Sequence, residues 1–281
     1  MPVEMTESGL VLGRSEPVYL IRGSYTKKGA NMLFAGDRDR FNTIKQNVSY
    51  YNEAAAIYNS IMQRDQSNKI VREKVKEKFT AVVKSGSVLE FGGGTGLDLE
   101  WLAAEGYSIF FCEPSFAMRE KAIDYNESIL HSAKVTFIEA AKTDFRNWQT
   151  NAPCPGKFDA ILSNFGVLNY IPDIRALFNN LAVVLKAGGH FVFLILHLDF
   201  KKRFRWHRRN AIHSLIFQRT FKMYIPFQNN RQTVFVHTPG EVLKASERYF
   251  DYREHEILKP FDFTLIHLVR NEKPCQEMVN G

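Results

Sequence analysis

Cysteine is scarce in this chain, with three residues, Cys112, Cys154 and Cys275, among 281. They are odd in number and lie far apart, which fits neither a disulfide framework nor a zinc site. The sequence therefore predicts reduced thiols and no bound metal.

Long apolar runs are also missing. The longest, residues 190–198, is too short to cross a bilayer, which takes roughly 20 apolar residues. Residues 1–10 lack the basic segment and apolar run of a signal peptide, and the chain has no internal repeat. We expect a soluble, cytoplasmic protein without a membrane span, acting as a monomer or homodimer.

Apolar residues make up 45% of the chain, enough to bury a large core. From residue 87 onward, short apolar runs alternate with helical patterns, which favours a parallel sheet with right-handed crossovers. We expect a helix with the apolar face Leu177, Leu181 and Leu185, ended by Gly188 and Gly189, and another over residues 239–250. The expected strands are residues 87–91, 108–112, 135–138, 158–163, 190–196, 252–258 and 263–269.

Glycines cluster directly after the first expected strand. In residues 88–96, Val-Leu-Glu-Phe-Gly-Gly-Gly-Thr-Gly, glycines at 92, 94 and 96 allow the backbone to pass close to a ligand. About 20 residues further on, Glu113 ends the second expected strand, where a carboxylate can accept both hydroxyls of a ribose. This pattern predicts a site for a nucleotide-like cofactor.

The glycine spacing separates two cofactor classes. A dinucleotide fingerprint requires glycine where this chain has Leu97. Glu90, two residues before the first glycine of the motif, would repel a pyrophosphate but suits a cofactor with an ammonium and a sulfonium group. These features indicate S-adenosylmethionine, whose product is S-adenosylhomocysteine.

With these motifs the chain resembles the class I S-adenosylmethionine-dependent methyltransferases, from about residue 50 to about residue 270. The family's E/D-x-G-x-G-x-G motif matches residues 90–96, and its acid after the second strand matches Glu113. Residues 158–164 resemble its fourth strand, and residues 185–193 its L-x-x-G-G turn into the fifth. The resemblance implies a Rossmann-like, doubly wound α/β fold. Its seven-stranded sheet would be mostly parallel with an antiparallel last strand, with a cap inserted after the fifth strand.

The resemblance also divides the chain into parts. Residues 1–46 would form an N-terminal arm, and residues 47–86 helices that cover the site. Residues 87–198 and 238–281 would form the cofactor-binding core, and residues 199–237 the inserted substrate cap.

Several cofactor contacts follow from the resemblance. Glu90 would contact the methionine amino group, Glu113 the ribose, and Tyr58 (or Tyr51) would cover the methionine end. The adenine position falls on two alanines, with Thr143 or Asp144 as the alternative. The full expected set is Tyr58, Glu90, Gly92, Gly94, Gly96, Glu113, Pro114, Met118, Ala140, Ala141, Asn164 and Phe165.

The chemistry of transfer asks mainly for positioning and exclusion of water, because the sulfonium is already activated. A general base is needed only for some acceptors. We expect His237 and Tyr170 to be the catalytic residues. The expected acceptor contacts are Asn169, Tyr170, Arg205 and His207.

Basic residues concentrate in the expected cap. Residues 201–209, Lys-Lys-Arg-Phe-Arg-Trp-His-Arg-Arg, account for most of the formal net charge of +7. Such a segment predicts an anionic partner, and its aromatics suit stacking on bases, although a solvated basic turn is the alternative.

Two signatures argue against a nucleic-acid target. The N/D-P-P-Y stretch of base-amine methyltransferases is replaced by Asn-Phe-Gly-Val at residues 164–167, and the Pro-Cys pair at 153–154 precedes the fourth strand. We therefore predict methyl transfer to a small-molecule acceptor, aromatic or anionic. The alternatives are a methyltransferase of RNA or protein that docks through residues 201–209, and a cofactor-binding protein without transfer activity.

Overall fold

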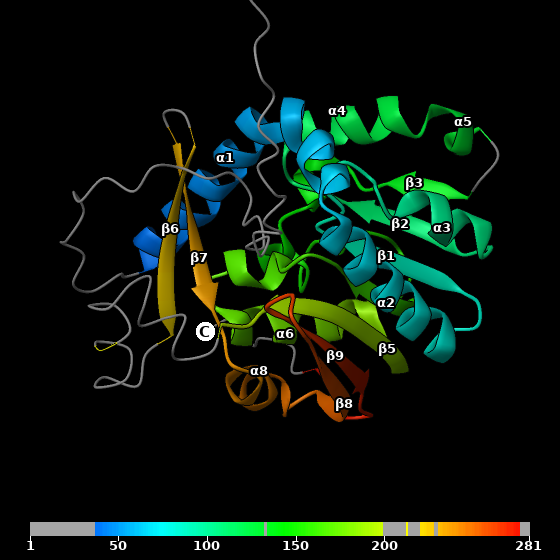
Figure 1. The fold of residues 1–281 in the computed structure, drawn as a ribbon. Helices are drawn as coiled ribbons and strands as arrows, with labels where there is room; N and C mark the ends of the chain where they lie inside the picture. The colour runs from blue at the N-terminus through cyan, green and yellow to red at the C-terminus, as the bar shows by residue number, and fades with distance from the viewer. Residues whose placement is uncertain (1–36, 132–133, 199–211, 213–219, 228–229, 276–281) are drawn as a thin grey trace, which may run out of the picture.

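The computed structural model describes residues 37–131, 134–198, 212, 220–227 and 230–275 (Figure 1). Its centre is a seven-stranded sheet in the order β3-β2-β1-β4-β5-β9-β8. The strands are β1 (Ser87–Phe91), β2 (Ser108–Cys112), β3 (Val135–Phe137), β4 (Phe158–Ser163), β5 (Leu185–Leu196), β8 (Phe250–Leu258) and β9 (Phe263–Arg270).

Strands β1 to β5 run parallel, whereas β9 lies antiparallel between β5 and β8. This is the sheet of a Rossmann-like methyltransferase fold, so the expected fold class is confirmed.

Helices cover both faces of the sheet. One face packs against α2 (Gln66–Val82), α3 (Leu99–Ala104) and α4 (Phe116–Tyr125), and the other against α6 (Ile174–Val184) and α8 (Pro239–Ser246). Successive strand residues point to opposite faces, so Val88 joins one buried cluster and Leu89 the other. The remaining helices of the core are α5 (Glu127–Leu130) and the short 3₁₀ turns η1 (Ala140–Lys142), η2 (Phe145–Asn147) and η3 (Val167–Tyr170).

The long helix α1 (Asp37–Arg64) begins inside the segment that we expected to be an arm. It contacts both β7 (Asn230–Val236), in the expected cap, and α4 of the core. Such tertiary packing stabilises helix beyond the part with a clear apolar period, which explains the misplaced start. Residues 1–36 lie outside the described residues.

Four boundaries in the second half of the chain also differ from expectation. Helix α6 ends at Val184 and β5 already begins at Leu185, because Leu185 pairs with Phe158 before a register shift in β4. Glycines 188 and 189 therefore lie inside β5 rather than between helix and strand. Helix α8 ends at Ser246, and β8 begins at Phe250.

Part of the expected cap is a β-hairpin of β6 (Phe221–Phe227) and β7 (Asn230–Val236). It lies beside α1 (Figure 1) and shares a buried cluster with Tyr50 and Ala54 of that helix. Asn47 joins α1 to β7 through two hydrogen bonds: its Nδ2 donates to the Thr233 carbonyl at 3.1 Å, and its Oδ1 accepts from the Thr233 N–H at 2.9 Å. The hairpin thus holds α1 in place above the core.

No helix among the described residues is long and apolar enough to cross a membrane. All three cysteines are free thiols.

Candidate functional site

A cavity of about 430 Å³ lies where β1, β2 and β4 end. Crevices at the carboxyl ends of parallel strands are the usual ligand sites of such sheets, and this volume is within the range of small-molecule pockets. Nine of the residues predicted to bind cofactor or acceptor line it: Tyr58, Gly92, Gly94, Glu113, Pro114, Met118, Asn164, Phe165 and Tyr170.

The glycine loop after β1 forms one wall of the cavity. A Cβ at Gly92 would lie 2.5 Å from Val167, and one at Gly96 would lie 2.6 Å from the Asn126 amide, so packing excludes a side chain at both. At Gly94 the nearest atom would be 3.9 Å away, on the Tyr58 ring. Gly94 therefore leaves room for a ligand against the backbone, whereas Gly96 serves packing and does not line the cavity.

Glu113 is fixed by backbone groups. Its Oε2 accepts the Gly94 N–H at 2.9 Å and its Oε1 accepts the Ser115 N–H at 2.8 Å. Burial raises the pKa of Glu113 to about 7, although these two bonds and Arg119 oppose that rise. Each carboxylate oxygen keeps a further lone pair, so both can accept a ribose hydroxyl.

Glu90 is buried without a hydrogen-bond partner. It is 2% exposed, and neither carboxylate oxygen makes a hydrogen bond among the described residues. Burial, followed by the nearby Asp98 carboxylate, raises the pKa of Glu90 well above its ordinary value. A buried, unpaired carboxyl is costly, so this site suits a ligand that brings an ammonium group. Glu90 itself is not among the residues that line the cavity.

An ion pair that the sequence did not reveal lies beside the part of the cavity where the methionine end of the cofactor is expected. Asp98 pairs with Arg72 of α2, and it accepts hydrogen bonds from the Trp101 indole at 2.8 Å and the Asn164 amide at 3.1 Å. The Arg72 guanidinium lies 4.8 Å from the centre of the Phe165 ring. This network fixes Asn164 and Phe165, which line the cavity. Arg72 lies too far from the glycine motif in sequence for any local pattern to link them.

The adenine side differs from the sequence prediction. Ala140 and Ala141 lie exposed in η1 and do not line the cavity, so the structure does not bring them to the other predicted cofactor residues. Their alternatives Thr143 and Asp144 do line it. The two alanines lie apart from the cavity because the turn η1 comes between β3 and the crevice at the strand ends.

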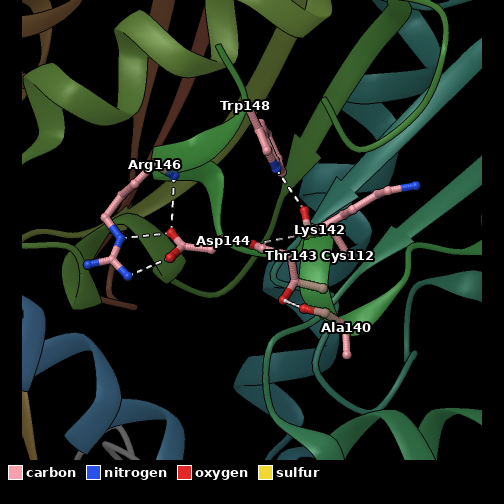
Figure 2. Close-up of polar contacts among 7 residues, drawn as sticks. All are labelled: Cys112, Ala140, Lys142, Thr143, Asp144, Arg146 and Trp148. Atoms are coloured by element: carbon pink, nitrogen blue, oxygen red, sulfur yellow. Dashed lines mark hydrogen bonds and ion pairs between the residues drawn. The ribbon is translucent and has the colours of Figure 1, made fainter. Parts of the chain in front are cut away.

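Hydrogen bonds hold this segment in shape (Figure 2). The Thr143 hydroxyl donates to the Ala140 carbonyl at 2.8 Å, and the Trp148 indole donates to the Lys142 carbonyl at 2.8 Å. Asp144 accepts from the Arg146 backbone and pairs with its guanidinium, which lowers the pKa of Asp144. Asp144 is therefore charged and already paired.

Asn169 has a structural place. It is 1% exposed; its Nδ2 donates to the Phe235 carbonyl at 2.7 Å, and its Oδ1 accepts the Leu196 N–H at 2.7 Å. These bonds tie the end of β5 to β7 and occupy both ends of the amide. Asn169 lines a second cavity of about 60 Å³ rather than the main one, contrary to a role in holding the acceptor there.

The structure also does not bring His237 to either cavity. Its ring is 2% exposed and faces the main-chain carbonyls of Leu168 and Ile171. Burial lowers the pKa of His237 to about 4, so the ring is neutral at pH 7. This position lies outside both cavities, so a role for His237 as a base stays a prediction from the sequence. The expected acceptor contacts Arg205 and His207 lie outside the described residues.

Comparison with known proteins agrees with this geometry. A family model described as a methyltransferase domain matches residues 62–238. A search among proteins of curated function gave no sequence match.

Three solved structures illustrate the shared fold. The complex of DhpI with SAH has a TM-score of 0.62 and 16% identity, over 83% of this chain and 99% of that one. An S-adenosylmethionine-dependent methyltransferase from Clostridium acetobutylicum has a TM-score of 0.54 and 16% identity, over 79% and 99%. The glycopeptide N-methyltransferase MtfA, complexed with S-adenosylhomocysteine, has a TM-score of 0.53 and 15% identity, over 71% and 89%. At these identities the likeness establishes the shared fold.

Proposed function

The chain belongs to the methyltransferase-domain family of enzymes, and on that premise we propose that it transfers a methyl group from S-adenosylmethionine to a small-molecule acceptor. The observation that carries this proposal is the cavity at the strand ends, which joins the glycine loop, Glu113 and the aromatic residues of α1 and η3. When bound, the donor supplies a methyl group already activated by its sulfonium.

The residues present fit this donor. The unpaired Glu90 carboxyl suits the amino group, and the open side of Gly94 admits the chain of the methionine against the backbone. Glu113 would hold the ribose hydroxyls, and Met118, Thr143 and Phe145 lie where the adenine would bind. This set offers one group for each chemical part of the donor.

The protein's part in the reaction is positioning. Among the described residues that line the cavity there is no histidine, and burial raises the pKa of Tyr170, so its phenol stays protonated at neutral pH. Tyr170 can therefore orient an acceptor by hydrogen bonding but does not act as a base. Holding the acceptor close to the methyl group with water excluded is worth several orders of magnitude in rate.

The mostly apolar lining, which comes from two sides of the cavity, favours a small acceptor. Helix α1 contributes Ile44, Val48 and Tyr51 to the lining, and Tyr170 and Ile171 complete it from the other side. The basic segment 201–209 lies outside the described residues, so an anionic acceptor, and docking of RNA or protein, stay predictions that rest on the sequence alone.

Calorimetric titration with S-adenosylhomocysteine, beside NAD as a control, tests the proposal. We expect micromolar affinity for S-adenosylhomocysteine and no binding of NAD. Binding of NAD alone, or of neither, would contradict it. A screen of small molecules and RNA for release of S-adenosylhomocysteine then separates the acceptor classes.

A further inference from the structure

Three tyrosines converge in the cavity beside the residues expected to hold the methionine end. Tyr51 and Tyr58 come from α1 and Tyr170 from η3, and all three line the cavity together with Phe165. The Tyr51 ring centre lies 6.3 Å from that of Tyr58 and 5.4 Å from that of Tyr170, at interplanar angles of 68° and 72°. We call these three residues the tyrosine cage.

The cage is held by elements far apart in the chain. The Asn47 amide of α1 donates to the Tyr170 carbonyl at 3.1 Å while it also binds Thr233 of β7. The fully buried Gln232 of β7 faces the hydroxyls of Tyr51 and Tyr170. The Asn47 bonds fix the backbone of Tyr170 relative to α1 and β7 before any acceptor binds, which lowers the entropy cost of binding.

The phenols of the cage are neutral. Burial is the largest cause that raises the pKa of Tyr51, Tyr58 and Tyr170 above the ordinary value of a phenol. Neutral aromatic rings present electron-rich faces, which attract cations and not carboxylates. Three such rings around one space favour a group that carries or develops positive charge.

The acidic groups around the cavity are already engaged. Glu113 accepts two backbone N–H bonds, and Asp144 is paired with Arg146. Within the described part of the lining, no histidine takes their place. Among the described lining residues, an alcohol or phenol acceptor would find no histidine and no unengaged carboxylate to remove its proton, whereas the lone pair of a neutral amine needs none.

Resting on the methyl-transfer function above, we propose that the acceptor is an amine whose nitrogen lies within the tyrosine cage. The nitrogen lone pair forms the new N–C bond to the methyl carbon while the C–S bond breaks and its electron pair stays on sulfur. The product ammonium then loses a proton to water. Positive charge thus passes from sulfur to nitrogen, and the ring faces stabilise it there.

A pair of probes with the same shape tests the cage without turnover. Choline and its uncharged carbon isostere, 3,3-dimethyl-1-butanol, are titrated calorimetrically into the full chain saturated with S-adenosylhomocysteine. We expect choline to bind about tenfold more tightly, within the range of cation–π recognition. Equal affinities, or no binding of choline, would overturn the proposal.

Variants assign the preference to the cage. Tyr51→Leu removes a ring face and should abolish most of the preference for choline, whereas Tyr51→Phe keeps the face and should retain it. Tyr252→Leu is the matched control, because Tyr252 is 46% exposed on β8 and lies outside the cavity lining. An equal loss of preference in the control, or none in Tyr51→Leu, would contradict the assignment.

The affinity for S-adenosylhomocysteine separates the two levels of the proposal. If S-adenosylhomocysteine does not bind the unmodified chain, the methyl-transfer function itself is wrong. If it binds normally while choline has no advantage, only the amine assignment is wrong. Unchanged affinity for S-adenosylhomocysteine in a variant also shows that the variant is folded.

Discussion

Replacing Glu113 with alanine should weaken binding of S-adenosylhomocysteine. The carboxylate would accept two ribose hydroxyls, and hydrogen bonds to charged groups contribute about 1.5–3 kcal/mol to binding when they replace bonds to water. We therefore expect the dissociation constant to rise by about 10- to 150-fold. The titration belongs at pH 8, because the pKa of Glu113 is raised to about 7 and the carboxyl is then mostly ionised.

The substitution also removes two hydrogen bonds within the protein, but this loss is the same in the free and the bound protein and so does not change the affinity. Without the carboxylate, the N–H groups of Gly94 and Ser115 lose their acceptor in both the free and the bound protein. Their cost of about 1–3 kcal/mol each appears in the unfolding free energy, which chemical denaturation measures separately. Affinity and stability therefore report on different bonds of the same side chain.

Glu139→Ala is the matched control for this experiment, because its side chain is 72% exposed and it does not line the cavity. We expect this variant to bind S-adenosylhomocysteine as the unmodified chain does. A dissociation constant of Glu113→Ala within about twofold of the control would refute the assignment of Glu113 to the ribose.

Three further outcomes are expected. Because burial raises the pKa of Glu90 and a bound ammonium group would lower it, binding of S-adenosylhomocysteine should release protons; calorimetry in buffers of different ionisation enthalpy would measure this, and identical heats would contradict it. Both Gly92 and Gly94 have positive φ, so alanine is strained at either position, but only at Gly92 would the Cβ also meet Val167, at 2.5 Å; Gly92→Ala should therefore lower the melting temperature more than Gly94→Ala does, and the reverse ranking would contradict this. Asn169→Ala should lower the unfolding free energy by about 1–3 kcal/mol through unsatisfied groups at Leu196 and Phe235, and an unchanged denaturation midpoint would contradict this.

The cofactor side of the site could be predicted because its signals are local. The glycine loop and Glu113 each follow a strand, Glu90 lies near the end of β1, and a parallel sheet brings strand ends to one edge without further information. Counting from a strand end is also why Ala140 and Ala141 were expected in the cavity. Their position was counted from β3, and the turn η1 that displaces them has no apolar period to reveal it.

The acceptor side could not be predicted in the same way, because its residues meet only through long-range packing. Tyr51 and Tyr170 become neighbours when α1 docks on β7 through Asn47. Histidine near a cap looks like a base in the sequence, yet His237 follows a strand whose last residues are buried, and it is carried into the interior. Burial lowers the pKa of His237 and raises the pKa of Tyr51 and Tyr170, so all three side chains are uncharged at neutral pH. Such a site suits a nucleophile whose lone pair is free before the reaction, as in a neutral amine, and the choline titration tests whether the tyrosine cage prefers the positive charge that this nitrogen gains.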